Sequence, residues 1–255
     1  MTRLSHRLAL ALMTAPLALA LSACGGEDDT AATAGSGPSG EPVEAVAAPE
    51  GQQWSEVITQ TDQEGYLMGN PDAPIKLVEY ASLTCPHCAE FYESAERDLI
   101  ADYVNTGRVS FEFRNFVRDP IDITGAMLSR CSAPESYFAL TGQIFENQQQ
   151  FFDAIRDGGE GAYQQAVSAP ADQRFVNLGQ ITGLTEFFAA RGVSIDQGND
   201  CLSKGAEAEA LANATSEASA QYNITGTPTF LINNTKIDGL TWPEVEAALQ
   251  RAGAR

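Results

Sequence analysis

Two cysteines three positions apart, Cys85 and Cys88, are the residues whose spacing points most directly to chemistry. Pro86 and His87 lie between them. Two thiols at this spacing can close one disulfide and open it again, which is redox chemistry by thiol–disulfide exchange. Pro86 suits the first turn of a helix, where its missing N–H costs no hydrogen bond and its fixed φ angle is already helical. The motif is therefore expected to open a helix.

The helix start predicts different roles for the two thiols. Unpaired N–H groups and the positive end of the helix dipole stabilise an anion, so we expect Cys85 to have the lower pKa and to be the attacking thiolate. Cys88 lies one turn further in and is expected to be the more buried, resolving thiol. His87 is expected to add a donor or a positive charge. A stabilised thiolate favours the reduced form and makes the disulfide a strong oxidant.

The segments that flank the motif predict the elements that position it. Ile75–Ala81 mixes apolar and β-branched residues as a half-buried strand does, and a helix is expected from residue 86 to about residue 105. Residues 109–116 alternate strictly between apolar and polar types, which predicts a strand parallel to the first, as in a βαβ unit. Residues 54–68 are expected to supply an earlier strand.

The C-terminal part predicts a helix, a hairpin and a final helix. A helix is expected from about residue 199 to residue 222, and Pro228 begins an apolar run typical of a strand. A hairpin through Asn233-Asn234 should lead to residues 236–238, and a last helix is expected over residues 242–252.

Two motifs in this order resemble the DsbA family of thioredoxin-like proteins. One is Cys-Pro-His-Cys between a strand and a helix, and the other is Ile224-Thr-Gly-Thr227-Pro228-Thr-Phe-Leu231, which resembles the family's cis-proline segment. The resemblance implies an α/β, thioredoxin-like fold with a helical insertion at about residues 122–200. It also implies a cis bond before Pro228, beside the redox pair, and a substrate chain that pairs with the backbone of Thr227.

The resemblance further implies a role for Glu79, six residues before Cys85, as a buried acid that accepts or relays protons. A solvated strand residue is the open alternative, because carboxylates are almost never fully buried without a partner. A C-x-x-C pair can also be half of a zinc site, but structural zinc needs four ligands and the sequence shows no second pair of this kind. We expect neither a metal nor a cofactor.

The N-terminal region predicts export and a lipid anchor. A basic start precedes an apolar stretch over residues 8–21 that is too short and too Pro-interrupted for a membrane span. It ends in Leu21-Ser-Ala-Cys24, which resembles the bacterial lipobox. We expect a signal peptide over residues 1–23 and lipid on Cys24; a plain secretory signal with an incidental cysteine is the alternative. Gly25 favours the outer membrane, so the expected location is the cell envelope, on the periplasmic side.

Composition divides the mature chain into two parts. Residues 24–53 are rich in Ala, Gly, Ser, Pro and Glu and contain no Lys or Arg, which predicts a lipid-anchored, disordered acidic linker. Residues 54–255 are expected to form one DsbA-like domain that includes the insertion.

The cysteine count predicts a second disulfide. Five cysteines are an odd number for an exported protein, but lipid on Cys24 leaves four. These make the redox pair and a structural pair, Cys131 and Cys201, which an oxidising envelope permits. Some DsbA relatives carry a second disulfide in the helical insertion, which supports the pairing. Two separate buried free cysteines are the alternative.

The predicted function is thiol–disulfide exchange with exported proteins, in the oxidising direction. The chain has 34 acidic and 15 basic residues and a net charge of −19, which argues against nucleic acid as a partner. We expect exported thiol-containing proteins as substrates, a membrane redox partner that reoxidises the pair, and a monomer. One alternative is a reductase or isomerase, because Thr227 before Pro228 resembles the disulfide isomerases, whereas Pro-His between the cysteines favours the oxidase. Another is a tethered chaperone or metal-delivery module.

Overall fold

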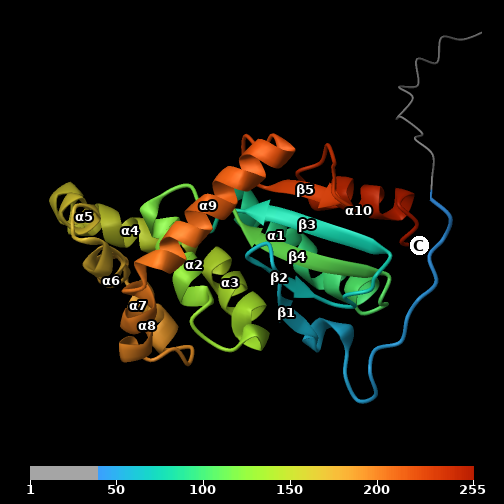
Figure 1. Ribbon diagram of the computed structural model, residues 1–255, viewed down its shortest axis with the longest axis horizontal. Helices are drawn as coiled ribbons and strands as arrows, with labels where there is room; N and C mark the ends of the chain where they lie inside the picture. The colour runs from blue at the N-terminus through green and yellow to red at the C-terminus, as the bar shows by residue number, and fades with distance from the viewer. Residues whose placement is uncertain (1–39) are drawn as a thin grey trace, which may run out of the picture. The chain divides into compact units, whose positions relative to one another are not determined.

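The structure is a computed structural model that describes residues 40–255. The expected signal peptide, Cys24 and the first part of the expected linker lie outside the described residues. One six-stranded sheet, in the order β1-β2-β4-β3-β5-β6, runs through the described chain. Its strands are β1 (Ile58–Gln60), β2 (Gly65–Met68), β3 (Ile75–Ala81), β4 (Val109–Asn115), β5 (Thr229–Ile232) and β6 (Thr235–Lys236) (Figure 1).

The centre of the sheet is a βαβ unit. β3 and β4 are parallel, with Ile75 opposite Val109 and Ala81 opposite Asn115, whereas the other neighbouring strands are antiparallel. The crossover consists of α1 (Pro86–Asp98) and a π-helical continuation, η2 (Leu99–Val104). The predicted parallel pair is therefore confirmed, and so is the predicted helix, although its last turns are π-helical.

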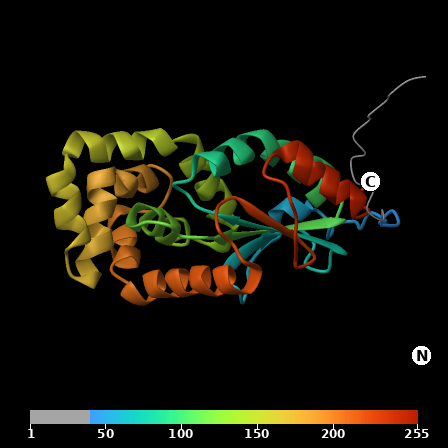
Figure 2. The ribbon, with the colours of Figure 1, turned by 90° about the horizontal axis from the view of Figure 1, so that it is seen from above.

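Helices cover both faces of the sheet and extend beyond one end of it. α1 and α10 (Trp242–Arg251) lie on one face, and α9 (Gly205–Tyr222) lies on the other (Figure 2). The insertion between β4 and α9 consists of η3 (Pro134–Ser136) and seven helices: α2 (Pro120–Ser129), α3 (Tyr137–Glu146), α4 (Gln148–Gly158), α5 (Glu160–Val167), α6 (Ala171–Thr182), α7 (Leu184–Ala189) and α8 (Ile195–Leu202). The described domain is a thioredoxin-like α/β fold with a helical insertion, as predicted.

The two central strands are more buried than their patterns predict. All of β3 except Lys76 is buried, and all seven residues of β4 are buried, because helices cover both faces. The polar residues of β4 therefore contact other side chains and not water. Arg114 donates through Nε and Nη2 to the two carboxylate oxygens of Glu112, both at 2.8 Å, and through Nη1 to Tyr80 Oη at 2.7 Å. This network satisfies two charges that would otherwise be costly to bury.

Two other predicted segments differ from the structure, and a third is confirmed. The predicted strand over residues 54–68 is a short 3-10 turn, η1 (Trp54–Glu56), followed by the hairpin of β1 and β2, because the chain reverses at Glu64, where φ is +54°. The predicted helix over residues 199–222 is two helices, α8 and α9, because Lys204 has a non-helical ψ of 80° between them. The predicted hairpin through Asn233 and Asn234 is confirmed, and both residues have positive φ, as its tight turn requires.

Residues 40–53 differ most from the prediction, because they lie against the domain. The backbone N–H groups of Gly40 and Val43 donate to the carbonyls of Arg251 (2.7 Å) and Gly253 (2.9 Å). The N–H of Val46 donates to Thr106 O (2.9 Å), and Val46 O accepts a hydrogen bond of 2.7 Å from the indole of Trp54. The prediction of a disordered linker over residues 24–53 is therefore wrong from residue 40 onward. Backbone groups of this segment hydrogen-bond to the domain, which composition alone does not predict.

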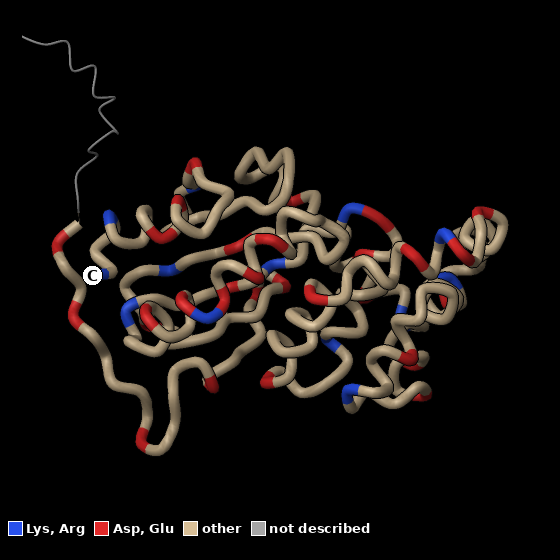
Figure 3. The backbone as a smooth tube through the Cα atoms, turned by 180° about the vertical axis from the view of Figure 1, so that it is seen from behind, with Lys and Arg blue, Asp and Glu red and all other residues tan. Residues whose placement is uncertain are grey.

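Charged residues are distributed over the whole described domain. Figure 3 shows Asp and Glu on the sheet part and on the insertion alike, with the fewer Lys and Arg scattered among them. The acidic residues are thus spread over the described domain and do not mark one element.

Candidate active site

The redox pair lies where β3 gives way to α1. Cys85 is the N-cap of α1, with an extended backbone (φ −91°, ψ 120°), and Pro86 occupies the first helical position. Both cysteines are free thiols, and the exposed fraction is 3% for Cys85 and 0% for Cys88. The Cys85 sulfur lies 3.2 Å from the carbonyl oxygen of Thr227, to which it donates when it is protonated. The predicted site residues Cys85, Cys88 and Thr227 are therefore together in space.

The surroundings move the pKa values of the two thiols in opposite directions. Hydrogen bonds from the Cys88 side chain, from Thr227 and from the backbone N–H groups of Cys88 and His87 lower the pKa of Cys85 to about 5, although burial opposes them. Burial, followed by the hydrogen bond to Cys85, raises the pKa of Cys88 far above its ordinary value. One thiol of the pair is thus a thiolate at neutral pH and the other is a protonated donor.

His87 makes its contribution in a way that the sequence did not predict. Its side chain is 74% exposed, and Nδ1 lies 3.0 Å from Glu90 Oε2 on the next turn of α1. The pKa of His87 is raised chiefly by this hydrogen bond and charge, with a smaller contribution from the charge of Cys85. The group of His87 that hydrogen-bonds the Cys85 sulfur is its backbone N–H. His87 thus supplies a backbone donor to the Cys85 sulfur, while its exposed imidazole turns toward Glu90.

The second motif forms the loop that faces the redox pair. The Thr227–Pro228 peptide bond is cis, and β5 begins at the next residue, antiparallel to β3. This loop borders an open groove of about 670 Å³, and Leu240 on its other side is 59% exposed. The groove has room for an extended chain against the backbone of Thr227, whose carbonyl oxygen contacts the Cys85 sulfur.

Glu79 is buried beneath the pair. Its exposed fraction is 4%, and no residue of the described chain hydrogen-bonds its Oε1 atom. Burial, and then the charge of Cys85, raise its pKa to about 8. The alternative of a solvated strand residue is therefore wrong, because α1 covers this face of β3.

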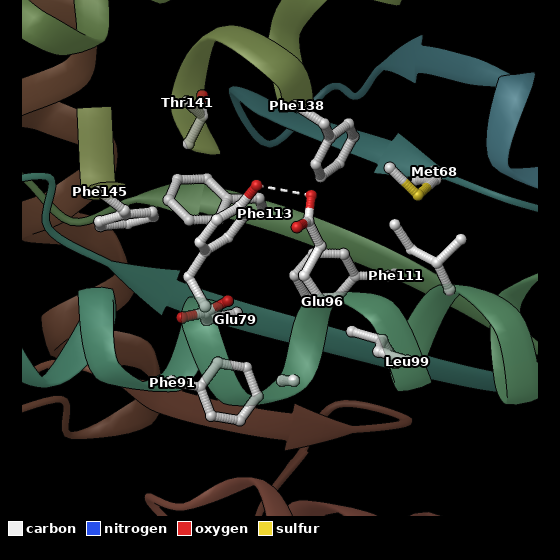
Figure 4. Close-up of a pocket in the computed structure, with 13 residues that line it drawn as sticks. Met68, Glu79, Phe91, Glu96, Leu99, Phe111, Phe113, Phe138, Thr141 and Phe145 are labelled. Carbon is white, nitrogen blue, oxygen red and sulfur yellow. Dashed lines mark hydrogen bonds between the residues drawn. The ribbon is translucent and has the colours of Figure 1, made fainter. Parts of the chain in front are cut away.

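Glu79 faces a small apolar pocket between α1, the sheet and α3. Figure 4 shows its carboxylate near the aromatic rings that line this pocket of about 40 Å³. The lining residues are Met68, Glu79, Phe91, Tyr92, Ala95, Glu96, Leu99, Ile100, Phe111, Phe113, Phe138, Thr141 and Phe145. In such surroundings the neutral acid is favoured over the carboxylate, so Glu79 holds a proton at neutral pH that it can exchange as the thiols change state.

The outer cysteines form a separate site in the insertion. Cys131, just after α2, and Cys201, in α8, are joined by a disulfide with a Cα–Cα distance of 6.0 Å across 70 positions of sequence. This is the pairing that the cysteine count predicted. The Cys131–Cys201 disulfide does not involve the redox pair, because Cys85 and Cys88 are both free thiols.

The sequence analysis missed two acidic residues that hold the segment before the redox pair. Asp119 is the N-cap of α2 and accepts from the Thr84 hydroxyl at 2.6 Å. Asp122 is fully buried, accepts from the N–H of Leu83 at 2.8 Å, and has a pKa that burial raises to about 7. The pair Asp119-Pro120 is a recognisable helix start, but nothing in the local pattern shows that this start meets the segment before Cys85.

Within residues 40–255, no group of three or more His, Cys, Asp or Glu side chains is placed to hold a metal ion. In the same part of the chain, no helix has the length and apolar character needed to cross a membrane.

Comparison with known proteins places this geometry in a family. Residues 61–251 match the family model described as thioredoxin. A solved structure from Novosphingobium aromaticivorans, titled protein-disulfide isomerase, is 34% identical, with a TM-score of 0.69 over 73% of this chain and 95% of that one. Wolbachia pipientis alpha-DsbA1 is 26% identical, with a TM-score of 0.60 over 73% and 89% of the two chains.

A curated relative from Rickettsia bellii, provisionally named a protein-disulfide oxidoreductase, is 26% identical over 77% of this chain and 67% of its own length. The chain thus spans about two thirds of that relative. The family match covers most of the described domain, and each of the two structural neighbours aligns with 73% of the chain. The chain therefore belongs to the thioredoxin family and, within it, to the DsbA-like thiol–disulfide oxidoreductases.

Proposed function

We propose that the protein is an oxidase that introduces disulfides into exported proteins. The observation that carries this direction is the separation of the two thiol pKa values, about 5 for Cys85 and far above the ordinary value for Cys88. A stabilised Cys85 thiolate lowers the free energy of the reduced form, so the disulfide gives up its oxidising equivalents readily. The pair then drives substrate thiols toward disulfides.

The proposed reaction has two exchange steps. A substrate thiolate attacks the Cys85 sulfur of the Cys85–Cys88 disulfide, a bond forms between substrate and Cys85, and Cys88 leaves and takes up a proton. The second substrate thiolate then attacks the substrate sulfur of this mixed disulfide, and Cys85 leaves as a thiolate. The substrate loses two electrons and the pair gains them. Glu79, whose charge acts on Cys88, is the proposed proton donor to that leaving group.

The proposed substrate is an extended segment of a thiol-containing protein. The groove beside Thr227 and Pro228 is open to solvent, and Thr227, which lines it, has its carbonyl oxygen 3.2 Å from the Cys85 sulfur. Main-chain pairing along this loop would bind many sequences, which suits an enzyme that acts on many exported proteins. A membrane redox partner would then take two electrons from the pair and restore the disulfide. We propose that the protein acts as a monomer.

We also propose that Cys24 carries lipid after removal of residues 1–23, on the periplasmic side of the envelope and at the outer membrane. The position of residues 40–46 supports an orientation of the domain in which the redox pair lies away from the anchor. Val46 binds beside Thr106, near the start of β4, whereas Cys85 follows the opposite end of the parallel strand β3. A chain anchored ahead of residue 40 would hold the redox pair at the end of the sheet away from its attachment point.

The direction of electron flow is tested by equilibrating the Cys85–Cys88 pair with glutathione and by following oxidation of a dithiol peptide. The oxidase proposal expects a pair that stays largely reduced over a wide range of glutathione ratios and a peptide that gains a disulfide. A pair that reduces peptide disulfides instead would contradict it. The anchor is tested separately by mass spectrometry of the native N-terminal peptide, in which Cys24→Ala should abolish the lipid mass.

A disulfide isomerase is the second candidate. Thr227 before Pro228 and the 34% identity to a structure titled protein-disulfide isomerase favour it. An isomerase would restore activity to a protein with scrambled disulfides while its own pair remained reduced, whereas an oxidase would need a stoichiometric oxidant. Refolding of a scrambled multi-disulfide substrate with and without added oxidant separates the two.

A further inference from the structure

The segment between β3 and the redox pair is held by side chains of the helical insertion. The N–H of Leu83 donates to Asp122, and the hydroxyl of Thr84 donates to Asp119, both at the start of α2. These partners are 39 and 35 residues away in sequence. The approach to the nucleophile is therefore fixed by the insertion and not only by the sheet.

Gln148 is the insertion residue that reaches the nucleophile itself. It is the first residue of α4, and its Nε2 atom donates to Leu83 O at 2.7 Å and to Cys85 O at 3.1 Å. An amide nitrogen has two hydrogens, so both are used. Cys85 O also accepts the first backbone bond of α1, from the N–H of Ala89 at 3.2 Å. The carbonyl of the N-cap residue is thus held between its own helix and the insertion.

We propose that Gln148 is a positioning residue of the redox pair, which sets the balance between dithiol and disulfide by holding the carbonyl groups of Leu83 and Cys85. The backbone N–H groups that hydrogen-bond the Cys85 sulfur belong to the first turn of α1. Hydrogen bonds weaken steeply when their geometry changes, so the orientation of the N-cap decides how well these donors point at sulfur.

A second effect acts in the same direction. The amide hydrogens of Gln148 oppose the partial negative charge of the Cys85 carbonyl, which lies on the same residue as the thiolate. Loss of this donor leaves an unopposed carbonyl dipole close to an anion in a largely buried site, where electrostatic effects are stronger than in water. Both effects concern the pair itself and act in either direction of electron flow.

The test compares two neighbouring glutamines. Gln148→Met keeps the length of the side chain but removes the donor, and Gln148→Glu replaces the donor with a negative charge. Gln149 is the matched control, because it is exposed in the same turn of α4 and its Nε2 donates to Asp153 instead, at 2.9 Å. Each variant is measured for the pH profile of Cys85 alkylation and for the glutathione equilibrium of the pair.

Gln148→Met removes both hydrogen bonds. Loss of the one to Cys85 O should shift the glutathione equilibrium toward the disulfide by about three- to tenfold and move the alkylation profile to higher pH. Gln148→Glu should shift both further, and the control variants Gln149→Met and Gln149→Glu should match the wild type. Unchanged profiles in both Gln148 variants would overturn the proposal. So would equal shifts in the Gln149 variants, or a lower melting temperature with an unmoved alkylation profile.

If Gln148→Glu does not fold, Gln148→Met alone tests the positioning role of Gln148. Gln148→Asn, which is too short to reach both carbonyls, replaces it if the methionine variant also fails to fold. A failure of the oxidase proposal would appear in the wild type as a reducing pair. That outcome leaves the difference between the Gln148 and Gln149 variants intact, so the two proposals are judged independently.

Discussion

The two cysteine pairs of this domain have opposite surroundings. Cys85 and Cys88 are three positions apart at the start of a helix, where backbone donors and burial give one thiol a low pKa and the other a high one. Cys131 and Cys201 are 70 positions apart and join two helices of the insertion in a disulfide. Helix-start donors surround only the first pair, and only the first pair contacts the cis-proline loop, which lines an open groove.

Because both pairs have the same sulfur chemistry, the difference shows that the surroundings of a cysteine pair decide whether it is redox-active. A long-range disulfide constrains the unfolded chain, and its contribution depends on the loop that it closes. A pair at a helix start gains little from such a constraint, because its loop is short, and it instead couples bond formation to the stability of one thiolate. Substitutions at the two pairs should therefore change different quantities.

The largest effect is expected at the redox pair. Cys85→Ser should abolish disulfide exchange, because no low-pKa thiolate remains, whereas Cys88→Ser should keep a reactive thiolate and accumulate a mixed disulfide with substrate. Alkylation of the reduced protein at pH 6, followed by peptide mapping, checks this order. Rapid labelling of Cys88 in the wild type would contradict the assignment of the nucleophile.

Loss of the outer disulfide should act on stability instead. Closing a loop of about 70 residues contributes about 4 kcal/mol in the chain-entropy model, so Cys131→Ala with Cys201→Ala should lower the free energy of unfolding by roughly 2–5 kcal/mol. Urea unfolding measures this change. The alkylation profile of Cys85 serves as the control and should match the wild type; a large shift in that profile would mean that the two pairs are coupled.

Glu79 should give stability a pH dependence of defined sign. Its pKa in the folded protein, about 8, is raised above the ordinary value of 4.5, so the folded state binds the extra proton between these values. Stability from this group is complete below about pH 4.5 and is lost as the pH rises through 8. Glu79→Gln removes this loss. With the redox pair in the dithiol state, the free energy of unfolding of the variant at pH 8.5 should therefore exceed that of the wild type by on the order of 2–4 kcal/mol.

Urea unfolding of both proteins at pH 4.5 and pH 8.5 tests this, because the ionisable groups away from Glu79 and the redox pair are common to the two and cancel in the difference. Glu90→Gln, which changes an exposed carboxyl on α1, should show no such difference between the two pH values. A wild type and a Glu79→Gln variant with parallel pH profiles would mean that Glu79 ionises normally.

The central part of the fold could be predicted from sequence because its signals are local. β3 begins and ends at the predicted residues, the proline of the Cys-Pro-His-Cys motif begins α1, and the Asn233-Asn234 turn closes the predicted hairpin. Each of these depends on backbone preferences within a few residues. The fold class and the place of the insertion then followed from the resemblance of two motifs in the same order.

The features that sequence did not predict depend on distant contacts. The burial of Glu79, which the resemblance implied but no local pattern predicted, is caused by α1 and α3 over β3. The hydrogen bonds from Gln148 cross 63 and 65 positions. Residues 40–46 have a linker-like composition, but they find backbone partners near Thr106 and Arg251. The turn of the His87 ring toward Glu90 is local in sequence, yet the choice between Glu90 and the sulfur is made by side-chain geometry.

The smallest effect is expected at His87, where the structure changes the sequence-based prediction. Because the exposed imidazole bonds to Glu90 and only the backbone N–H of His87 hydrogen-bonds the Cys85 sulfur, His87→Ser should raise the pKa of Cys85 only slightly. An exposed charge is screened by water and salt, so the shift should shrink further in high salt. Glutathione equilibria of His87→Ser and Glu90→Gln at low and high ionic strength provide the measurement. A shift for His87→Ser larger than that for Gln148→Met would show that the side chain, and not the backbone geometry of the helix start, controls the redox pair.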